Sequence, residues 1–518
     1  MRLPIQVEQP GRTVGTRAML AVITLTVALL FSPTIVMDQP VAAAAGSSIT
    51  VSPQVAGPGT SITIAGQRMG SRTSGTILFD GSPVATFSTG GGGKFSVAWT
   101  LPAQVSSGEH IIMAATSATA ASDTLQVEST TPSPAPSPIP SSDYVPTPIT
   151  GTTYFVDCTE GNDANLGTSP GAAWQSLTRS DSKMLAPGDA TLFRRGCEWT
   201  RTPTAFTVDE SGTSSARLVF GAYGTGARPI IRGGYDAFRV NGSWAIVEGI
   251  EVRNTAPPNS QPNCPTGWRT GFGLYGSHVT LRYVKASENT TGVHVSGNGF
   301  HVVTHSEFTN NYYLSRNTVG GTDDSGAWGV LVNASDNEVD HNYLSGNNAW
   351  CSYDFGQEGA SVELGGALRN RIHHNRSVDD TTFTELTNGD SNNRFYYNLI
   401  VNRAHSRVEA FNLRGSDNDV RHNTVSYSSP SGKGIVGGDV ASDFSDNVID
   451  APQNYIGGTQ TRNYWGNPGF VDPGAYDFHL ADGSAATDAG QVTAGNVDLD
   501  GVAVPQKGAA DLGAYEGQ

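Results

Sequence analysis

The sequence predicts an all-β protein in which a small β-sandwich is followed by a parallel β-helix. The chain holds 62 glycines and only 15% charged residues, which is typical of a turn-rich β protein. Residues 47–129 show short strands with alternating apolar side chains, and residues 150–518 carry a short motif at regular intervals. At 518 residues, the chain is also long enough for two structural units.

The first element is an expected signal peptide at residues 1–45. Three arginines precede the apolar run 18–31, and small residues follow at 41–46. A retained anchor helix is the alternative, but this run is short for a bilayer, which takes about 20 residues. We therefore predict a secreted, extracellular protein.

The chain is acidic, with a formal net charge of −16 from 31 basic and 47 acidic residues. A surface of this charge repels nucleic acid and anionic membranes, so we expect neither as a partner after signal removal. It argues only weakly against acidic polysaccharides, because a local basic groove or a bound cation reverses the field. We expect a monomer.

The second element, residues 47–129, resembles bacterial immunoglobulin-like modules in its strand rhythm, which implies a small Ig-like β-sandwich. No catalytic constellation occurs in it, so a spacer or a glycan- or wall-binding accessory is the expected role. Residues 130–149 are rich in Pro and Ser and are expected to form an extended linker.

The third element, residues 150–518, is organised by the motif Asn-x-apolar-x-x-Asn. Full copies read NEVDHN, NRIHHN, NRFYYN and NDVRHN, and end at Asn342, Asn375, Asn398 and Asn423. Including degenerate copies, successive starts lie 22 to 25 residues apart, with three longer steps of 33 to 36. Units of this length bury a core only when stacked as coils. Leucine-rich repeats need a leucine framework absent here, so we predict a parallel β-helix with a structural asparagine ladder.

This region resembles the pectate-lyase-like family of right-handed parallel β-helix proteins. The resemblance is strongest at the entry, in residues 154–177, 185–199 and 221–231, and at the exit, in residues 470–490 and 511–516. It implies a right-handed helix with a C-terminal closing segment. It is nearly silent on chemistry, because members include lyases, glycosidases, esterases and phage tailspikes.

The four cysteines fit an oxidising compartment, where pairs are usually disulfides. Three pairings are possible, and proximity along the chain favours Cys158 with Cys197 and Cys264 with Cys351. No spacing of Cys and His resembles a zinc site.

Three glutamates recur seven to nine residues before successive asparagine motifs: Glu363, Glu385 and Glu409. Alternation points Glu363 outward, the other two follow by alignment, and His294 falls on the same column. Neighbouring coils lie about 4.8 Å apart, so the acids repel one another and one pKa rises. A separation of about 5 to 5.5 Å suits a retaining glycosidase. Calcium binding and a solvated surface are the alternatives.

For some of these residues, the sequence also supports another interpretation. The register of Glu409 slips by two positions, and a nearby arginine, Arg407 or Arg414, could simply pair with it. Some β-helix xylosidases take two catalytic acids from adjacent coils, which agrees with Glu363 and Glu385. The histidines of the asparagine motif, His373, His374 and His422, are interpreted as turn residues rather than bases.

The three long steps place insertions near 254–271, 312–327 and 345–358, just before the outward column, where they should form cleft walls. They carry residue types that bind sugars. Together with His294 and Arg414, the predicted substrate-binding residues are Trp268, Asp323, Asp324, Trp350, Tyr353, Asp354 and Glu358. Asp323 and Asp324 could instead bind calcium or make a turn. A resemblance to β-helix galacturonases ends at this pair.

We therefore expect a secreted polysaccharide-degrading enzyme, a glycoside hydrolase with Glu363, Glu385 and Glu409 as candidate catalytic acids. No cofactor is required, and calcium is left open. A polysaccharide lyase is the first alternative; it needs a base and a uronate neutraliser, and lysine is scarce in this region, although His294, Arg407 and Arg414 could serve. A non-catalytic surface or cell-wall glycan-binding protein is the second.

Overall fold

The computed structural model describes residues 46–56, 59–102, 108–127, 144–255, 266–321, 323–386, 389–405, 408–429, 432–436, 441–454, 457–491, 497–506 and 508–517. The chain divides into two compact units, 1–131 and 132–518. The predicted signal peptide lies outside the described residues. Among those described, no helix has the length and apolar character needed to cross a bilayer.

The first unit contains two sheets that share one hydrophobic core. One sheet has the order β1 (Ser48–Ser52), β3 (Ser61–Gln67), β6 (Phe95–Thr100). The other has the order β2 (Val55–Ala56), β8 (Ala120–Val127), β7 (Gly108–Thr116), β4 (Ser74–Phe79), β5 (Ser82–Ser88). Alternate residues such as Ile62 and Ile64 are fully buried, as expected for strands with one face on a core. The immunoglobulin-like assignment stays a prediction.

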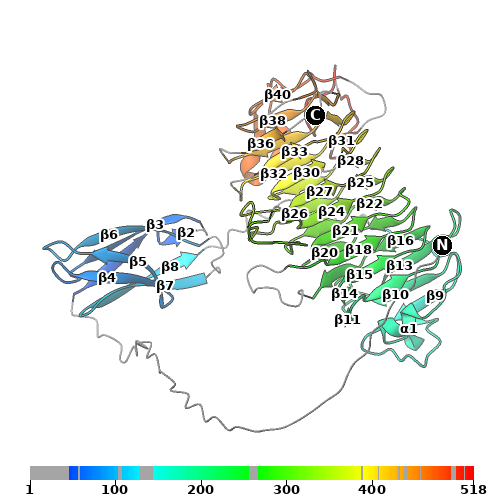
Figure 1. The fold of residues 1–518 in the computed structure, drawn as a ribbon, viewed down its shortest axis with the longest axis horizontal. Helices are drawn as coiled ribbons and strands as arrows, with labels where there is room; N and C mark the ends of the chain where they lie inside the picture. Colours follow the sequence, from blue (N-terminus) through cyan, green and yellow to red (C-terminus); the bar gives the residue numbers. More distant parts are fainter. Residues whose placement is uncertain are drawn as a thin grey trace, which may run out of the picture. The chain divides into compact units, whose positions relative to one another are not determined.

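The second unit is built from three long parallel sheets, to which each coil contributes one strand apiece (Figure 1). The first sheet consists of β9 (Thr153–Val156), β10 (Ala190–Arg194), β13 (Leu218–Tyr223), β16 (Ala245–Glu248), β19 (Thr280–Arg282), β22 (Val302–Thr304), β25 (Glu338–Asp340), β28 (Arg371–His373), β31 (Arg394–Tyr396), β34 (Asp419–Arg421), β37 (Asp443–Ser445) and β39 (Thr459–Thr461).

The second sheet consists of β11 (Glu198–Thr200), β14 (Ile230–Gly233), β17 (Glu251–Asn254), β20 (Lys285–Ser287), β23 (Glu307–Thr309), β26 (Tyr343–Ser345), β29 (Arg376–Val378), β32 (Leu399–Asn402), β35 (Thr424–Tyr427), β38 (Val448–Asp450) and β40 (Tyr464–Trp465). The third sheet consists of β12 (Phe206–Val208), β15 (Asp236–Val240), β18 (Thr270–Leu274), β21 (Thr291–Val295), β24 (Trp328–Val332), β27 (Ala360–Leu364), β30 (Thr382–Leu386), β33 (Glu409–Asn412) and β36 (Lys433–Val436).

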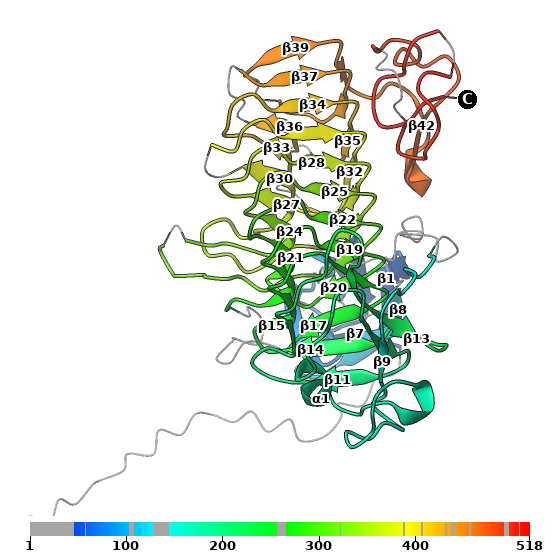
Figure 2. The same ribbon diagram turned by 90° about the vertical axis from the view of Figure 1, so that its right-hand side faces the viewer.

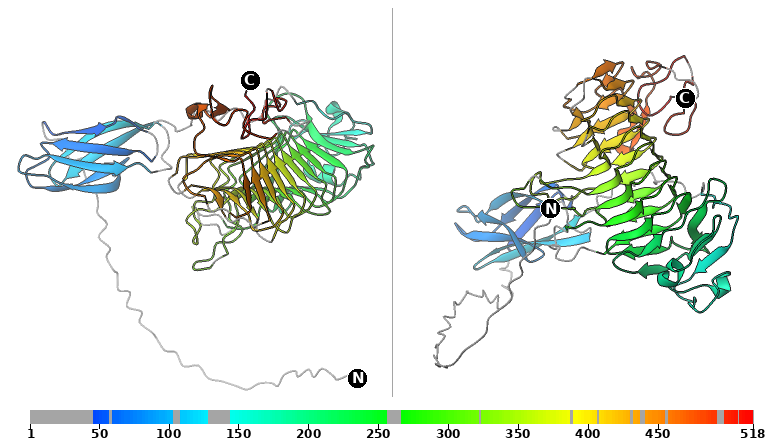
Figure 3. Two further views of the ribbon diagram at one scale, coloured as in Figure 1. Left: turned by 90° about the horizontal axis from the view of Figure 1, so that it is seen from above. Right: turned by 45° about the vertical axis from the view of Figure 1, so that its right-hand side comes forward.

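The stacked coils confirm the predicted parallel β-helix (Figure 3). Each strand pairs in parallel register with its counterparts in the neighbouring coils, as in the contact of Val362 with Thr384. Connections between parallel strands of a sheet are right-handed. Inward side chains form a continuous core, in which aromatic rings stack from coil to coil: Phe206 lies 5.1 Å from Phe238, which lies 6.0 Å from Phe272.

The predicted asparagine ladder is confirmed. The Nδ2 of Asn375 donates to Oδ1 of Asn398 at 3.1 Å, and Asn398 donates in turn to Asn423 at 2.9 Å. Both backbone and side-chain amides of these buried residues are satisfied by the next coil, so the ladder fixes the stacking of the coils. The first asparagines of the motifs form a second such ladder, in which Asn370 donates to Asn393.

The prediction of turn residues is confirmed for His374 and His422 but is wrong for His373, which is the last residue of β28 and lies 2.9 Å from Glu338. His341, His374 and His422 have positive φ angles between 50° and 53°, and their side chains stack in one column. The ring of His341 lies 4.9 Å from that of His374, and Tyr397 continues the stack to His422 at 5.0 Å. The stacked rings pack the turns of successive coils against one another, and His341 also lies with His305 and Asp340 in a group whose possible ligand atoms are within 4.8 Å of one another.

The C-terminal segment packs along the side of the β-helix (Figure 2). It contains β41 (Phe470–Asp472), the short 3-10 turn η3 (Pro473–Ala475) and β42 (Asp477–Leu480). Its buried residues Phe478 and Leu512 share a core with outward residues of the second sheet such as Leu399. The segment thereby shields that face from solvent.

The opening coil is held by a disulfide between Cys158 and Cys197, as predicted. The turn η2 (Pro170–Ala172) and the helix α1 (Leu177–Asp181) lie between these cysteines in the chain. Of the second predicted pair, Cys264 lies outside the described residues. The final part of the predicted linker contacts the first sheet, where the backbone N–H of Thr147 donates to Glu248 at 2.9 Å.

Candidate active site on the third sheet

The register of the third sheet gathers one outward residue from each coil into a single row, here called the outward row. It consists of Arg239, Gly273, His294, Leu331, Glu363, Glu385 and Asn412. Glu363 and Glu385 are direct cross-strand partners. Their chain neighbours, such as Val362 and Leu364, are fully buried, so both glutamates point away from the core. The structure therefore brings together the two acids singled out by the sequence, and His294 lies in the same row.

The prediction that Glu409 shares this row is wrong. Glu409 is in register with Thr382, and the cross-strand partner of Glu385 in the outward row is Asn412. The turn that joins β33 to the next strand differs in length from the turns before it, so counting back from the asparagine motif gives the wrong position. The Glu409 carboxylate still lies beside the row, because Asn412 Nδ2 donates to Glu409 Oε2 at 3.2 Å and to Glu385 Oε1 at 3.4 Å.

Glu363 lies in an environment that favours the protonated carboxyl group. Burial, followed by the nearby negative charge of Glu385, raises its pKa to about 8. The charge of Glu358 acts in the same direction, so this predicted substrate-binding residue lies near the acid. The indole N–H of Trp328 donates to Glu363 Oε2, which opposes the shift by stabilising the carboxylate form.

Glu385 lies in an environment that favours the charged carboxylate. Arg414 Nη2 lies 3.2 Å from Glu385 Oε1, and Asn412 donates to the same oxygen. Glu409 in turn pairs with Lys433, whose Nζ lies 2.9 Å from Oε1. Cations therefore lie on the C-terminal side of the pair, beyond Glu385.

The N-terminal side of the pair is apolar and aromatic. Leu331 precedes Glu363 in the outward row and shares a small buried cluster with Trp328 and Ala360, against which Trp268 packs. The ring of Trp268 lies 5.7 Å from His294. His294 Nε2 shares a hydrogen bond of 2.8 Å with Asn333 Oδ1, and burial lowers the pKa of His294.

The predicted insertions do lie between the second and third sheets, directly before the strands of the outward row, and they bond to one another. The N–H of Gly267 donates to the carbonyl of Leu314, and Asn317 Nδ2 donates to the carbonyl of Cys351, both within 2.9 Å. Trp350 and Tyr353 are exposed, with 39% and 53% of their surface accessible, so their rings are open to a ligand. Figure 2 shows loops projecting from one edge of the stack near β21 and β24.

The structure also gathers Asp323, Asp324 and Asp354 within this wall, with ligand atoms no more than 4.8 Å apart. Most of their oxygens already accept bonds from the loop. The N–H groups of Asp323 and Asp324 donate to Asp354 Oδ2, and Thr318 donates to Asp323 at 3.1 Å. These bonds account for the cluster as a turn that joins two insertions. The three carboxylates offer donor atoms of the kind calcium binds, and calcium stays open here.

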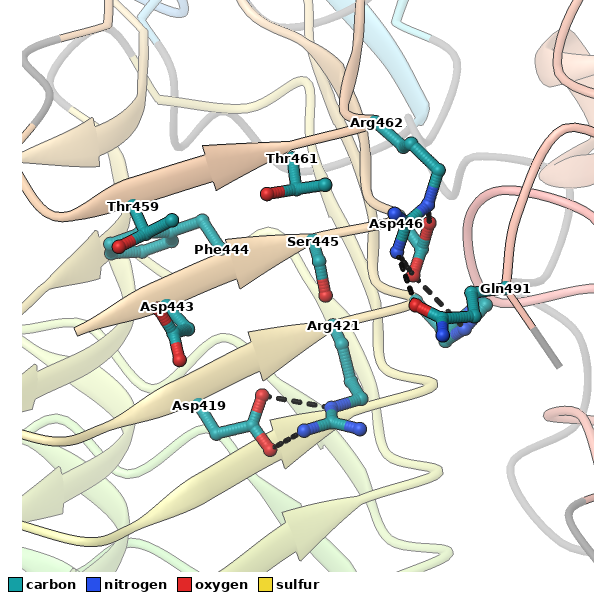
Figure 4. Close-up of a pocket in the computed structure, with 11 residues that line it drawn as sticks. Asp419, Arg421, Asp443, Phe444, Ser445, Asp446, Thr459, Thr461, Arg462 and Gln491 are labelled. Carbon is teal, nitrogen blue, oxygen red and sulfur yellow. Dashed lines mark hydrogen bonds and ion pairs between the residues drawn. The ribbon is translucent and has the colours of Figure 1, made fainter. Parts of the chain in front are cut away.

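A second polar depression lies on the outer face of the first sheet, over β34, β37 and β39 (Figure 4). Two of its three aspartates are paired with arginines: Asp419 bonds to Arg421, and Asp446 accepts from Arg462 at 2.6 Å. Gln491 of the C-terminal segment closes one side. Asp419 and Asp443 are cross-strand partners in this depression, but Asp443 is exposed to solvent and Asp419 bonds to Arg421.

Known proteins share this fold. No model of a protein family matches the chain. The crystal structure of pectate lyase Pel9A superposes with a TM-score of 0.52 at 17% identity, over 71% of this chain and 96% of that one. A GH136 lacto-N-biosidase from Eubacterium ramulus gives 0.40 at 13% identity, over 61% and 68%. The likeness to Pel9A shows a parallel β-helix.

In sequence, a lacto-N-biosidase of Bifidobacterium longum subsp. longum is 37% identical over 89 residues, which are 16% of this chain. The chain spans 6% of the length of that relative.

Three residues of the site were not predicted. Asn412 donates to Glu385, and Lys433 pairs with Glu409. Leu331 lies between His294 and Glu363 in the outward row. Asn412 has a signal in the sequence: it lies between apolar residues in F-N-L, as Glu363 does in V-E-L. Lys433 has none that we can identify, because its coil lacks that triplet.

Proposed function

We propose that this β-helix acts on a polysaccharide as a glycoside hydrolase, with Glu363 as proton donor and Glu385 as the ionised carboxylate. The observation that carries this proposal is the cross-strand pairing of the two acids in opposite electrostatic surroundings. Neighbouring environments that drive two carboxyl groups to different protonation states are typical of an acid and nucleophile pair. The β-helix fold shared with a pectate lyase and the local match to a lacto-N-biosidase support a role on glycans.

The separation of the two coils supports a retaining mechanism. Adjacent strands lie about 4.8 Å apart, and a retaining pair needs about 5 to 5.5 Å. Glu363 donates its proton to the glycosidic oxygen while Glu385 bonds to the anomeric carbon, and the leaving sugar departs as an alcohol. Glu363, now ionised, takes a proton from water, whose oxygen displaces Glu385 and regenerates both groups.

Four of the groups around the pair have supporting roles. Arg414 and Asn412 hold Glu385 charged and oriented, and Trp328 orients Glu363. Glu409 is assigned to the support of Asn412, since its carboxylate is occupied by Lys433. Export through residues 1–45 and action as a monomer remain part of this proposal.

The decisive experiment incubates the full-length protein with a panel of neutral and uronate glycans. Release of reducing ends without new absorbance near 235 nm supports hydrolysis, because only β-elimination makes the unsaturated uronate that absorbs there. Proton NMR of the first product then reports whether the anomeric configuration is retained. Absorbance near 235 nm contradicts the proposal in favour of a lyase, and binding without turnover favours a non-catalytic glycan-binding protein.

A further inference from the structure

Among the described basic residues on or beside the outward row, four are paired or enclosed, while Arg316 of the insertion 312–327 is exposed and Arg407 lies outside the described residues. Arg414 and Lys433 each bind a glutamate, as described above, and Arg239 Nη1 lies 3.3 Å from Asp236 Oδ2. Arg239 also lies 4.6 Å from the ring of Tyr275. The fourth, Arg269, is buried and donates to the backbone carbonyls of Trp268 and Thr255.

The outward row and the insertions beside it are here called the groove. The acids around the pair give this groove a negative potential. Glu363 is next to Glu385, and the charges of Glu358 and Asp390 also oppose its ionisation. A uronate carboxylate placed at the cleaved bond would add a further negative charge to this group. Sites that bind uronates instead present unpaired arginines or a bound cation to the carboxylate.

The apolar half of the groove offers what a neutral sugar needs. Trp268 is partly exposed and packs against Leu331 and Trp328, which both lie on the coil before Glu363. Aromatic faces pack on the C–H groups of pyranose rings, and this contact gains nothing from substrate charge.

We infer that the groove binds a neutral glycan, with the sugar before the cleaved bond on the Trp268 side and no recognition of a uronate carboxylate. This inference rests on the proposed function, since it concerns the same groove. It departs from the acidic substrate that the name of pectate lyase Pel9A suggests for that protein.

The test separates binding from turnover by using the full-length Glu363→Gln variant in isothermal titration calorimetry. The ligands are matched hexasaccharides of neutral sugars (xylose, glucose, galactose, N-acetylglucosamine) and of galacturonate and mannuronate. Each is titrated at low and high salt, with calcium chloride or with EDTA. We expect a neutral ligand to bind at least about tenfold more tightly than either uronate, with a Kd that salt hardly changes, because screening acts on charge pairs.

Two substitutions complete the test. Trp268→Ala should weaken neutral binding about tenfold by removing a stacking face. Arg316→Ala should leave it unchanged; Arg316 is the exposed basic residue of the insertion 312–327. Tighter uronate binding that salt weakens, uronate binding that requires calcium or Arg316, or no binding of any neutral ligand would each overturn the inference. Neutral binding without turnover by the unsubstituted protein would leave it standing and reject the hydrolase.

Discussion

The outer faces of the first and third sheets carry the same kinds of charged residue in different arrangements. On the first sheet, Glu338 lies 2.7 Å from Arg371, and Asp419, whose register partner on the next coil is the exposed Asp443, bonds to Arg421. On the third sheet, Glu363 is the cross-strand partner of Glu385, and Arg414 pairs with Glu385 alone. Paired charges are compatible with a stable surface, whereas adjacent like charges oppose folding. Asp443 on the first sheet is exposed to solvent, whereas burial and the neighbouring charge of Glu385 raise the pKa of Glu363, so function is expected at Glu363 and Glu385.

The largest effect that tests this comparison is loss of catalysis. Glu363→Gln and Glu385→Gln keep the shape of each side chain but remove the proton donor or the nucleophile, so kcat should fall by about 10²- to 10⁴-fold or more. Initial rates on the best substrate of the panel measure it. Glu338→Gln on the first sheet is the matched control and should keep near-normal kcat. An active double variant of Glu363 and Glu385 rejects the assignment.

A smaller effect concerns the pH profile. With the pKa of Glu363 raised to about 8 by burial and by Glu385, the acid form is present below that pH, and kcat should fall as pH rises through it. Trp328→Phe removes an N–H that stabilises the carboxylate, so the alkaline limb should move to higher pH with kcat within about tenfold of normal. A limb that stays in place, or moves down, contradicts this role for Trp328.

The same pKa predicts a stability difference. The folded protein holds Glu363 protonated up to about pH 8, while the unfolded chain ionises near 4.5. Stability from this group is complete below 4.5 and is lost as pH rises from there to about 8. Glu363→Gln should therefore have a higher Tm than the unsubstituted protein at pH 9 and an equal one at pH 4, by differential scanning calorimetry. Glu338→Gln should show no gain at pH 9, since Glu338 faces Arg371 and His373.

The smallest expected effect is that of chelation. Four of the six carboxylate oxygens of Asp323, Asp324 and Asp354 already accept N–H or O–H bonds from their loops, whereas Asp324 Oδ1 is buried without a partner among the described residues. EDTA should therefore change neither kcat nor Tm measurably. A fall in Tm that added calcium restores, and that Asp354→Asn abolishes, would show that the turn binds the ion.

Most of the fold could be predicted from the sequence because the repeated motif is visible over several coils. Apolar residues flanked by asparagine motifs recur in every coil, and both the ladder and the parallel sheets follow from stacking them. The Glu363 and Glu385 pair was also predictable, since each acid lies between two inward residues. Glu409 shows the limit: it too has buried neighbours, Val408 and Ala410, and only the register with Thr382 reveals that Asn412 takes the row position.

The partners of the site could not be predicted, because they come from separate parts of the chain. Lys433 reaches Glu409 from the next coil, and Trp328 reaches Glu363 from the previous one. Which pairs form depends on side-chain direction and on turn lengths that vary between coils. The connection from Asn412 to Asn418 is shorter than that from Glu385 to Asn393, and a motif count does not record such a change.

The ladder of Asn375, Asn398 and Asn423 makes the β-helix a molecular ruler. Because every coil is bonded to the next at one repeat distance, the gap between two acids in the outward row changes only in whole steps of about 4.8 Å. Moving one acid from Glu363 to the position of Leu331 would widen the gap to about 9.6 Å, near the upper end of the range used by inverting enzymes. In such a scaffold, the number of coils between the two acids would determine the stereochemistry of the product.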